Sequence, residues 1–181
     1  MSAALLELPS PGLWDDALLP EAAAPAPVDP FAVQAAELAA ALPGAPRTIL
    51  DVGSGSAVWS LAMAARLPLA HVVAVDLPAV VGRAHATADA LGVDRRRTSL
   101  VAGDYHDVVL PSKLGRIVVA NVLRLERPDG ARRLLARLAA QLAPGGRLVV
   151  VDAAAGSPAC SSAGELASSG LSLASAHLIV Y

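Results

Sequence analysis

The sequence contains one cysteine, Cys160, and aromatic residues make up only 3% of its 181 residues. A single cysteine excludes an intrachain disulfide, and no set of residues has the spacing of zinc ligands, so we expect no metal site. Since 55% of the residues are hydrophobic, that content is mostly Ala, Leu and Val. This composition predicts close-packed helices and buried strands, and it suits a reducing cytoplasm.

An excess of one charge and a long hydrophobic run are also absent. The chain has 14 Lys and Arg against 16 Asp and Glu, a formal net charge of -2, which disfavours nucleic acid as a partner. The clusters Arg95–Arg97 and Arg132-Arg133 are interpreted as solvated surface beside helices. No secretory signal pattern opens the chain, and no uncharged apolar run reaches about 18 residues. We therefore expect a soluble, cytoplasmic protein without a membrane span.

The length fits one domain with its own core. Prolines at positions 9, 11, 20, 25, 27 and 30 interrupt residues 1–30, which predicts an extended N-terminal arm. We expect the domain itself to cover residues 31–181. Its first element is a predicted helix over residues 31–42, where apolar residues recur at helical spacing until Pro43-Gly44 ends it.

Short runs rich in Val, Ile and Leu alternate with helical stretches beyond this point. The predicted strands are 48–52, 71–75, 99–102, 117–122 and 148–151, and the predicted helices are 58–66, 79–91 and 130–142, the last ended by Pro144-Gly145-Gly146. Residues 171–176 and 177–181 are predicted to form two closing strands. Strands that are apolar on both faces and alternate with helices indicate a doubly wound α/β domain with a mostly parallel sheet. Ligands of such sheets bind beyond the carboxyl ends of the strands.

The first of these strand ends carries an acid followed by a glycine turn, Asp51-Val-Gly53-Ser-Gly55-Ser-Ala57. Two residues without a Cβ let a ligand approach the backbone, and the helix that follows offers free N–H groups. A dinucleotide site would require a small residue where Val58 stands. The acid suits a ligand that carries an ammonium group as well as a carboxylate. The turn alone is equally consistent with a structural bend.

Acids also follow the second and third strands. Asp76, at the end of the second strand, can accept hydrogen bonds from the vicinal hydroxyls of a ribose, or it can cap the next helix. Asp104 follows a glycine after the third strand and can accept a hydrogen bond from an adenine amino group, or it can stabilise a turn. Three acids at three successive strand ends favour the ligand interpretation.

Together these segments resemble the class I S-adenosylmethionine-dependent methyltransferases, and most closely the small-molecule O-methyltransferase family of the caffeic-acid and hydroxyindole type. The matching stretches, in order, are ILDVGSGSAVWSLAMAARLP, VVAVDLPAVV, LVAGDYHD and VVANVLRLERPDGARRLLARLAAQLAPGGRLVVVD. They cover residues 47 to 152. The Asp-Leu-Pro after the second strand is a fairly specific mark of that family.

The resemblance implies a Rossmann-like sheet of seven strands, with an antiparallel last strand, that binds S-adenosyl-L-methionine. Carried over residue by residue, it places Asp51, Gly53 and Gly55 at the methionine part of the cofactor and Asp76 at its ribose.

The same resemblance assigns the adenine to Leu77, Asp104 and Tyr105, and places Asn121 near the methionine or the sulfonium. The implied activity is methyl transfer to an O- or N-nucleophile of a small-molecule acceptor.

Arg124 stands where these enzymes usually carry a general-base His, in the run Val122-Leu123-Arg124. Arginine keeps its proton at physiological pH and cannot take one from a hydroxyl group. His106 and Glu126 are the other titratable groups near strand ends, but the resemblance puts His106 beside the adenine. An acceptor that is already ionised, or an amine, needs only positioning against the sulfonium.

Two further departures bear on the acceptor. The family's N-terminal helical domain, which dimerises and walls the substrate pocket, has no counterpart in residues 1–30, and the segment before the closing strands is short. The acceptor pocket is therefore expected to be shallow, completed by another chain as in a homodimer, or absent. A catalytically degenerate domain that binds S-adenosylmethionine or a partner without turnover is the alternative function, and a nicotinamide-dependent oxidoreductase is a more distant one.

Overall fold

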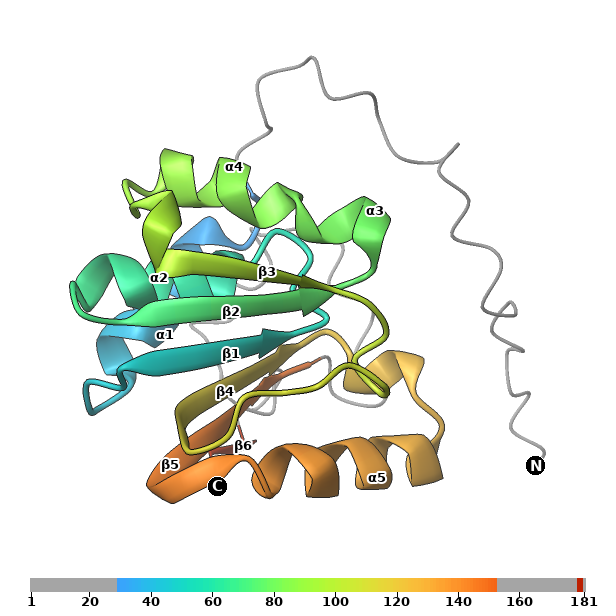
Figure 1. Ribbon diagram of the computed structural model, residues 1–181. Helices are drawn as coiled ribbons and strands as arrows, with labels where there is room; N and C mark the ends of the chain where they lie inside the picture. The colour runs from blue at the N-terminus through green and yellow to red at the C-terminus, as the bar shows by residue number, and fades with distance from the viewer. Residues whose placement is uncertain (1–28, 153–178, 181) are drawn as a thin grey trace, which may run out of the picture.

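The computed structural model describes residues 29–152 and 179–180, and they build one sheet with the strand order β3-β2-β1-β4-β5-β6 (Figure 1). The strands are β1 (Thr48–Val52), β2 (His71–Asp76), β3 (Thr98–Ala102), β4 (Leu114–Ala120), β5 (Leu142–Val151) and β6 (Ile179–Val180). The first five all run parallel. The predicted α/β domain with a parallel sheet is therefore confirmed.

The structure describes only a small part of the predicted closing strands at the end of the sheet. Strand β6 has two residues and pairs antiparallel with β5, with Val180 opposite Val149. The rest of the predicted closing strands, and residues 1–28 of the arm predicted over residues 1–30, lie outside the described residues. A full antiparallel last strand and the seventh strand therefore stay predictions.

Alternate residues of each strand pack into two separate hydrophobic cores, because successive side chains of a strand point to opposite faces of the sheet. Ile49 belongs to a cluster with the helices α1 (Ala32–Ala41), α2 (Val58–Arg66), α3 (Pro78–Val81) and α4 (Arg83–Ala90). Its neighbour Leu50 belongs to a second cluster with α5 (Pro128–Ala139). Figure 1 shows α5 on the opposite side of the sheet from α2 and α4. Both faces are covered, as a parallel sheet requires.

Several predicted element boundaries are wrong. The predicted helix over 79–91 is two helices that meet at Gly82. The helix over 130–142 ends instead at Ala139, and Pro144-Gly145-Gly146 lies within β5, where residues 143–146 face the single residue Gly115 of β4. The fourth strand also starts earlier than residue 117 and ends at Ala120.

The arginine cluster at residues 95–97 is solvated only in part. Arg95 and Arg96 are exposed and form ion pairs with acids. Arg97 is half-buried, and its Nη1 donates to the carbonyl oxygens that end α2 and lead into β2, those of Ala64, Leu67, Pro68 and Ala70. This side chain therefore holds a helix end rather than facing solvent.

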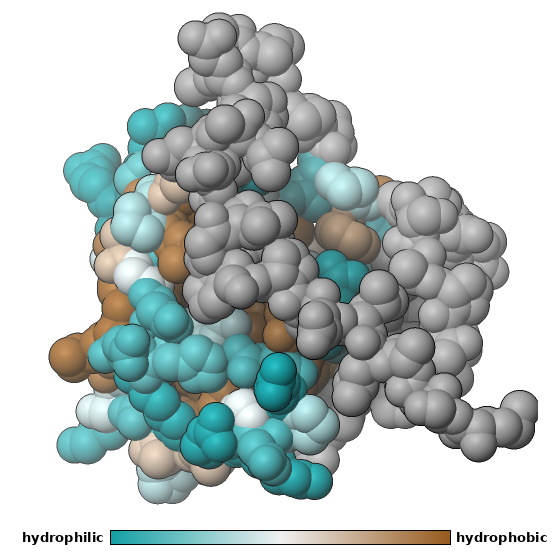
Figure 2. All heavy atoms as spheres, turned by 90° about the vertical axis from the view of Figure 1, so that its right-hand side faces the viewer, coloured by the Kyte–Doolittle hydropathy of each residue, from teal (hydrophilic) through white to brown (hydrophobic). Residues whose placement is uncertain are grey.

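The carboxyl ends of β1, β2 and β3 meet at one edge of the sheet, where the arrowheads lie in Figure 1. Figure 2 faces this edge and shows apolar and hydrophilic side chains next to each other on it. Within the described ranges, no helix is long and apolar enough to cross a membrane.

Candidate functional site

The turn after β1 adopts a left-handed backbone at alternate residues. Gly53, Gly55 and Ala57 have φ angles of 60°, 55° and 57°. The Ser54 amide donates to the Val75 carbonyl of β2 at 3.0 Å, and the Ala57 amide donates to the Ser54 carbonyl at 2.6 Å. These bonds hold the turn against the end of β2 and start α2 directly beyond it.

Asp51 is the buried acid in front of this turn, with an exposed fraction of 1%. Its Oδ2 has no hydrogen-bond partner among the described residues. Burial raises the pKa of the Asp51 carboxyl to about 7, against hydrogen bonding by Ser60 that lowers it, and the charge of Asp76 raises it further. A buried carboxylate oxygen without a partner costs free energy that a cationic ligand would recover.

Asp76 joins the two neighbouring strand ends through both of its carboxylate oxygens. Its Oδ2 accepts a hydrogen bond from the Gly55 amide at 2.7 Å, and its Oδ1 accepts one from the Leu77 amide at 2.7 Å. Leu77 is the N-cap residue of the short helix α3, and no side-chain hydrogen bond caps that helix, so the interpretation of Asp76 as a helix cap is wrong. Each carboxylate oxygen retains a second acceptor site. Asp76 can therefore orient the glycine turn and still accept hydroxyl groups.

Tyr105 and Val122 lie over the glycine turn. A Cβ on Gly53 would meet Val122 Cγ2 at 2.5 Å and Tyr105 Cε1 at 3.7 Å. The Tyr105 hydroxyl donates to Glu126 Oε1 at 2.8 Å, and the same oxygen lies 2.8 Å from His106 Nε2. Burial and the Glu126 carboxylate raise the pKa of Tyr105. Tyr105 thus stays neutral and is held in place as part of the wall of the site.

Asp104 lies in the turn after β3. Its Oδ1 accepts a hydrogen bond from the His106 amide at 2.8 Å, and its carbonyl accepts bonds from the Asp107 and Val108 amides at 2.9 Å. This is the turn role that the sequence left open. The side chain is exposed at the same sheet edge as Asp76.

Asn121 and Arg124 follow β4. Asn121 has a φ of 59°, and its amide donates to the Val151 carbonyl at 2.7 Å. The Arg124 amide donates to Asp152 Oδ2 at 3.0 Å, and its Nε donates to the Asn121 carbonyl at 3.3 Å. Arg124 lies in the 3-10 turn Leu123–Leu125 and is exposed. The interpretation of Arg124 as a solvated side chain near a helix start is consistent with this position.

Three contacts of the site have no counterpart among the sequence predictions. Asp29, just before α1, accepts hydrogen bonds from the Phe31 amide and from the Ser56 hydroxyl of the glycine turn. Hydrogen bonding by Ser60 lowers the pKa of Asp51, and Glu126 accepts a hydrogen bond from the Tyr105 hydroxyl. The one available signal was Ser60, a hydroxyl in an otherwise apolar helical stretch; the other two pairings join residues more than 20 positions apart.

A model of the O-methyltransferase domain family matches residues 34–175 of this sequence. This chain belongs to the small-molecule O-methyltransferase family of class I methyltransferases. The resemblance drawn from the strand ends is therefore confirmed.

Relatives of this O-methyltransferase family member are substantially longer. Demethylspheroidene O-methyltransferase from Cereibacter sphaeroides is 30% identical over 110 residues, which are 61% of this chain and 29% of that protein. An O-methyltransferase family 2 protein from Planctomyces limnophilus, solved in complex with apigenin, is 31% identical with a TM-score of 0.62, over 68% of this chain and 39% of that one.

A third relative was solved with S-adenosylmethionine and a second small molecule bound. An O-methyltransferase from neocarzinostatin biosynthesis, solved with S-adenosylmethionine and 2-hydroxy-5-methyl naphthoic acid, is 28% identical with a TM-score of 0.54, over 62% of this chain and 34% of that one. The chain thus spans about a third of the length of these relatives.

Proposed function

We propose that this chain is the cofactor-binding domain of an S-adenosylmethionine-dependent O-methyltransferase that acts on a small molecule. The observation that carries the proposal is the buried, unpaired Oδ2 of Asp51 beside a glycine turn. An α-amino acid presents an ammonium group that can pair with this oxygen. Gly55 lets the same ligand reach the backbone of the turn, because nothing lies within 4 Å of an added Cβ there, whereas Val122 fills that space at Gly53.

The other strand ends supply the remaining contacts of the cofactor in this proposal. Asp76 accepts hydrogen bonds from the ribose hydroxyls while its oxygens hold the Gly55 and Leu77 amides. Leu77 has an exposed fraction of 38% and offers apolar surface for a base to pack against.

Tyr105 and Asp104 complete the adenine side, and Asn121 lies toward the methionine. The left-handed backbone of Asn121 turns the chain immediately after β4, toward the Val122 that covers Gly53. When bound, S-adenosylmethionine supplies an electrophilic methyl group on a sulfonium sulfur. The protein's own task is to position an acceptor oxygen against it.

The acceptor is proposed to be an acidic hydroxyl group, such as a phenol, that is ionised without a protein base. Arg124 replaces the base of the resembling enzymes, and its Nε is bonded to the Asn121 carbonyl. A cation at this position favours an anionic nucleophile electrostatically and cannot accept its proton. The naphthoic acid and apigenin bound by two relatives are aromatic hydroxyl compounds of this kind.

Finer features of the resemblance also belong to the proposal. We infer a final antiparallel strand beside β5, for which the pairing of Ile179 with Val150 is the support. We also propose a homodimer that completes the acceptor pocket, and a cytoplasmic location. Size-exclusion chromatography with light scattering would test the dimer.

The activity is tested by a labelled-methyl transfer assay on the full chain with a panel of phenols and hydroxy acids. The expected result is transfer to at least one acceptor, and its loss in Asp51→Asn. Asp129→Asn is the matched control, since Asp129 is an exposed acid on α5. If the parent binds S-adenosylhomocysteine but labels no acceptor, the chain is a binding domain without turnover, and the enzymatic proposal is wrong.

A further inference from the structure

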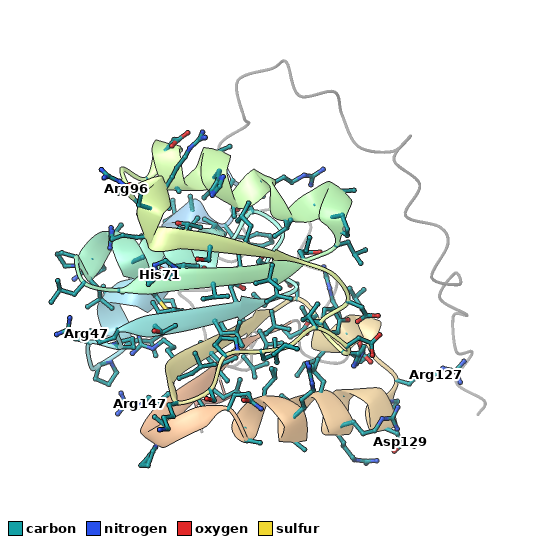
Figure 3. All side chains as sticks on the ribbon, viewed as in Figure 1. Arg47, His71, Arg96, Arg127, Asp129 and Arg147 are labelled. Carbon is teal, nitrogen blue, oxygen red and sulfur yellow. The ribbon has the colours of Figure 1, made fainter. Side chains whose placement is uncertain are left out.

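A cavity lies at the edge of the sheet opposite the glycine turn, where the strands begin. Its volume is about 210 Å³, the space of several water molecules. The lining comes from three segments, residues 43–46 before β1, residues 115–116 of β4 and residues 143–147 of β5. Figure 3 shows Arg147 and Arg47 at this end of the strands, away from the glycine turn. The cavity is therefore separate from the proposed methyl-transfer site.

Arg116 is a buried cation in the wall of this cavity. It has an exposed fraction of 2% although it lies in the middle of an apolar strand. Its Nη2 donates to the Pro43 carbonyl at 2.7 Å, and its Nη1 lies 3.8 Å from the sulfur of Met63. Its Nε has no hydrogen-bond partner among the described residues. A buried guanidinium with an unused donor is costly unless something accepts from it.

A second guanidinium converges on the same point. Arg147 Nη1 donates to the Pro43 carbonyl at 2.8 Å, so two cations share one neutral acceptor. Every residue that lines the cavity is Pro, Gly, Ala or Arg, so no carboxylate neutralises the pair there. Burial and the Arg147 charge lower the pKa of Arg116. The two positive charges lie close together without a counterion from the lining.

The remaining walls are backbone held in close contact. A Cβ on Gly146 would lie 2.5 Å from the Leu114 carbonyl oxygen, and one on Gly115 would lie 2.8 Å from Pro46 Cβ. Gly44 lies against Arg147, since its added Cβ would be 3.5 Å from Nη1. These glycines allow the three chain segments to pack closely around Arg116, while Arg147 stays half-buried. The Pro144-Gly145-Gly146 run serves this packing within β5 and does not end a helix.

We propose that this cavity binds a small oxyanion, a phosphate or a carboxylate group, between Arg116 and Arg147. Arginine presents planar pairs of donors that match both groups, and such charge-assisted bonds are stronger than hydrogen bonds between neutral groups. The oxyanion accepts from the more exposed guanidinium of Arg147 and offsets the positive charge of the buried Arg116 beside it. The competing explanation is that both arginines only brace the Pro43 carbonyl, in which case added anions have no specific effect.

The test is a titration of the full chain with inorganic phosphate and, separately, with acetate, at constant ionic strength set with chloride. Calorimetry and the thermal midpoint are the two measurements, because a ligand that binds only the folded state raises that midpoint with concentration. We expect saturable binding in the parent chain. The anion that saturates binding at the lower concentration shows whether the site prefers phosphate or carboxylate.

Variants separate a specific site from general screening. We expect Arg147→Gln to weaken oxyanion binding about ten- to a hundredfold, the effect of losing a charged hydrogen bond. The matched control Arg132→Gln removes an exposed arginine of α5 and should bind as the parent does. Arg116→Met removes the buried charge at similar volume and should abolish binding. If Arg116→Met does not fold, Arg147→Gln alone decides.

Two outcomes contradict the proposal. The first is no saturable response to either anion in the parent, and the second is an equal response in Arg147→Gln and the parent. The cofactor affinity of Arg147→Gln separates this site from the methyl-transfer site, since S-adenosylhomocysteine should bind that variant as it binds the parent.

Discussion

The backbone amide of Gly55 donates a hydrogen bond to Asp76 Oδ2 at 2.7 Å, which ties the turn after the first strand to the carboxyl end of the second. The left-handed Gly55 has no atom within 4 Å of an added Cβ, so the turn is open on this side. One carboxylate therefore shapes the turn and faces the space where a ligand would lie. The two strand ends act as a single site.

Replacing Asp51 with Asn should stabilise the domain above neutral pH. The folded-state pKa of about 7 lies above the ordinary value of 3.8, so the folded chain holds this proton more tightly than the unfolded chain. Burying the ionised Asp51 carboxylate lowers the free energy of unfolding. This destabilisation is absent below about pH 4, grows as the pH rises to about 7 and is constant above that. We expect Asp51→Asn to gain about 1–3 kcal/mol of unfolding free energy at alkaline pH.

Urea unfolding of the parent and of Asp51→Asn across that pH range measures this difference. The same variant should lose cofactor binding, because the amide cannot pair with an ammonium group as a carboxylate does. A constant difference in unfolding free energy at all pH values would show that Asp51 does not titrate in this range.

Cofactor binding should release a proton below neutral pH. An ammonium group beside Asp51 favours the ionised carboxylate, so binding lowers the raised pKa. The affinity for S-adenosylhomocysteine should rise up to about tenfold per pH unit as the pH approaches about 7, and then level off. Calorimetry at about pH 6 in two buffers of different ionisation enthalpy should count close to one proton released. Identical heats in the two buffers would exclude this pairing.

Gly53→Ala should disrupt the turn through both backbone and packing. Gly53 has a φ of 60°, and its added Cβ would meet Val122 Cγ2 at 2.5 Å. We expect a loss of about 2–4 kcal/mol in the free energy of unfolding. Gly55→Ala is the matched control, since it has a φ of 55° and no neighbour within 4 Å. Its loss should be about 1–2 kcal/mol, from backbone strain alone.

A double-mutant cycle with Val122→Ala isolates the steric part of that loss. Removing the valine methyl groups should make Gly53→Ala less costly, with a coupling energy of about 1 kcal/mol or more. No coupling would mean that the turn relaxes away from Val122, and that the covering of Gly53 is not rigid.

Arg124→His should restore a proton acceptor at the position of the family's base. In the parent, transfer should follow the ionisation of the acceptor, so that weakly acidic phenols react slowly at neutral pH. The variant should accelerate these phenols by about tenfold or more and leave strongly acidic acceptors nearly unchanged. The measurement is the rate of labelled-methyl transfer across a series of phenols of graded pKa. Equal effects on all acceptors would mean that Arg124 acts in some way other than as a missing base.

The sequence predicts those parts of the fold whose signals are local. The bounds of β1 and α2 follow directly from an apolar run, an acid and a glycine turn. The run Pro144-Gly145-Gly146 has the local signature of a helix end. Its place in β5 is decided by packing against Leu114 and Gly115, which no local pattern reports.

The candidate site divides in the same way. Acids at strand ends can be identified in the sequence, and a parallel sheet brings those ends together at one edge. The pairing of Tyr105 with Glu126, and of Ser56 with Asp29, joins distant positions and has no sequence signature. The unpaired oxygen of Asp51 likewise has no sequence signature, since burial and hydrogen-bond partners are properties of the packed chain.

Calorimetric titration with S-adenosylhomocysteine of the parent, of Asp76→Ala and of the control Asp129→Asn tests the central claim most directly. The account predicts binding of one equivalent to the parent and to Asp129→Asn. In Asp76→Ala the affinity should fall about tenfold or more, because the variant loses both a ribose acceptor and the bond that holds Gly55. Absence of binding to the parent, or an unchanged affinity in Asp76→Ala, would contradict it.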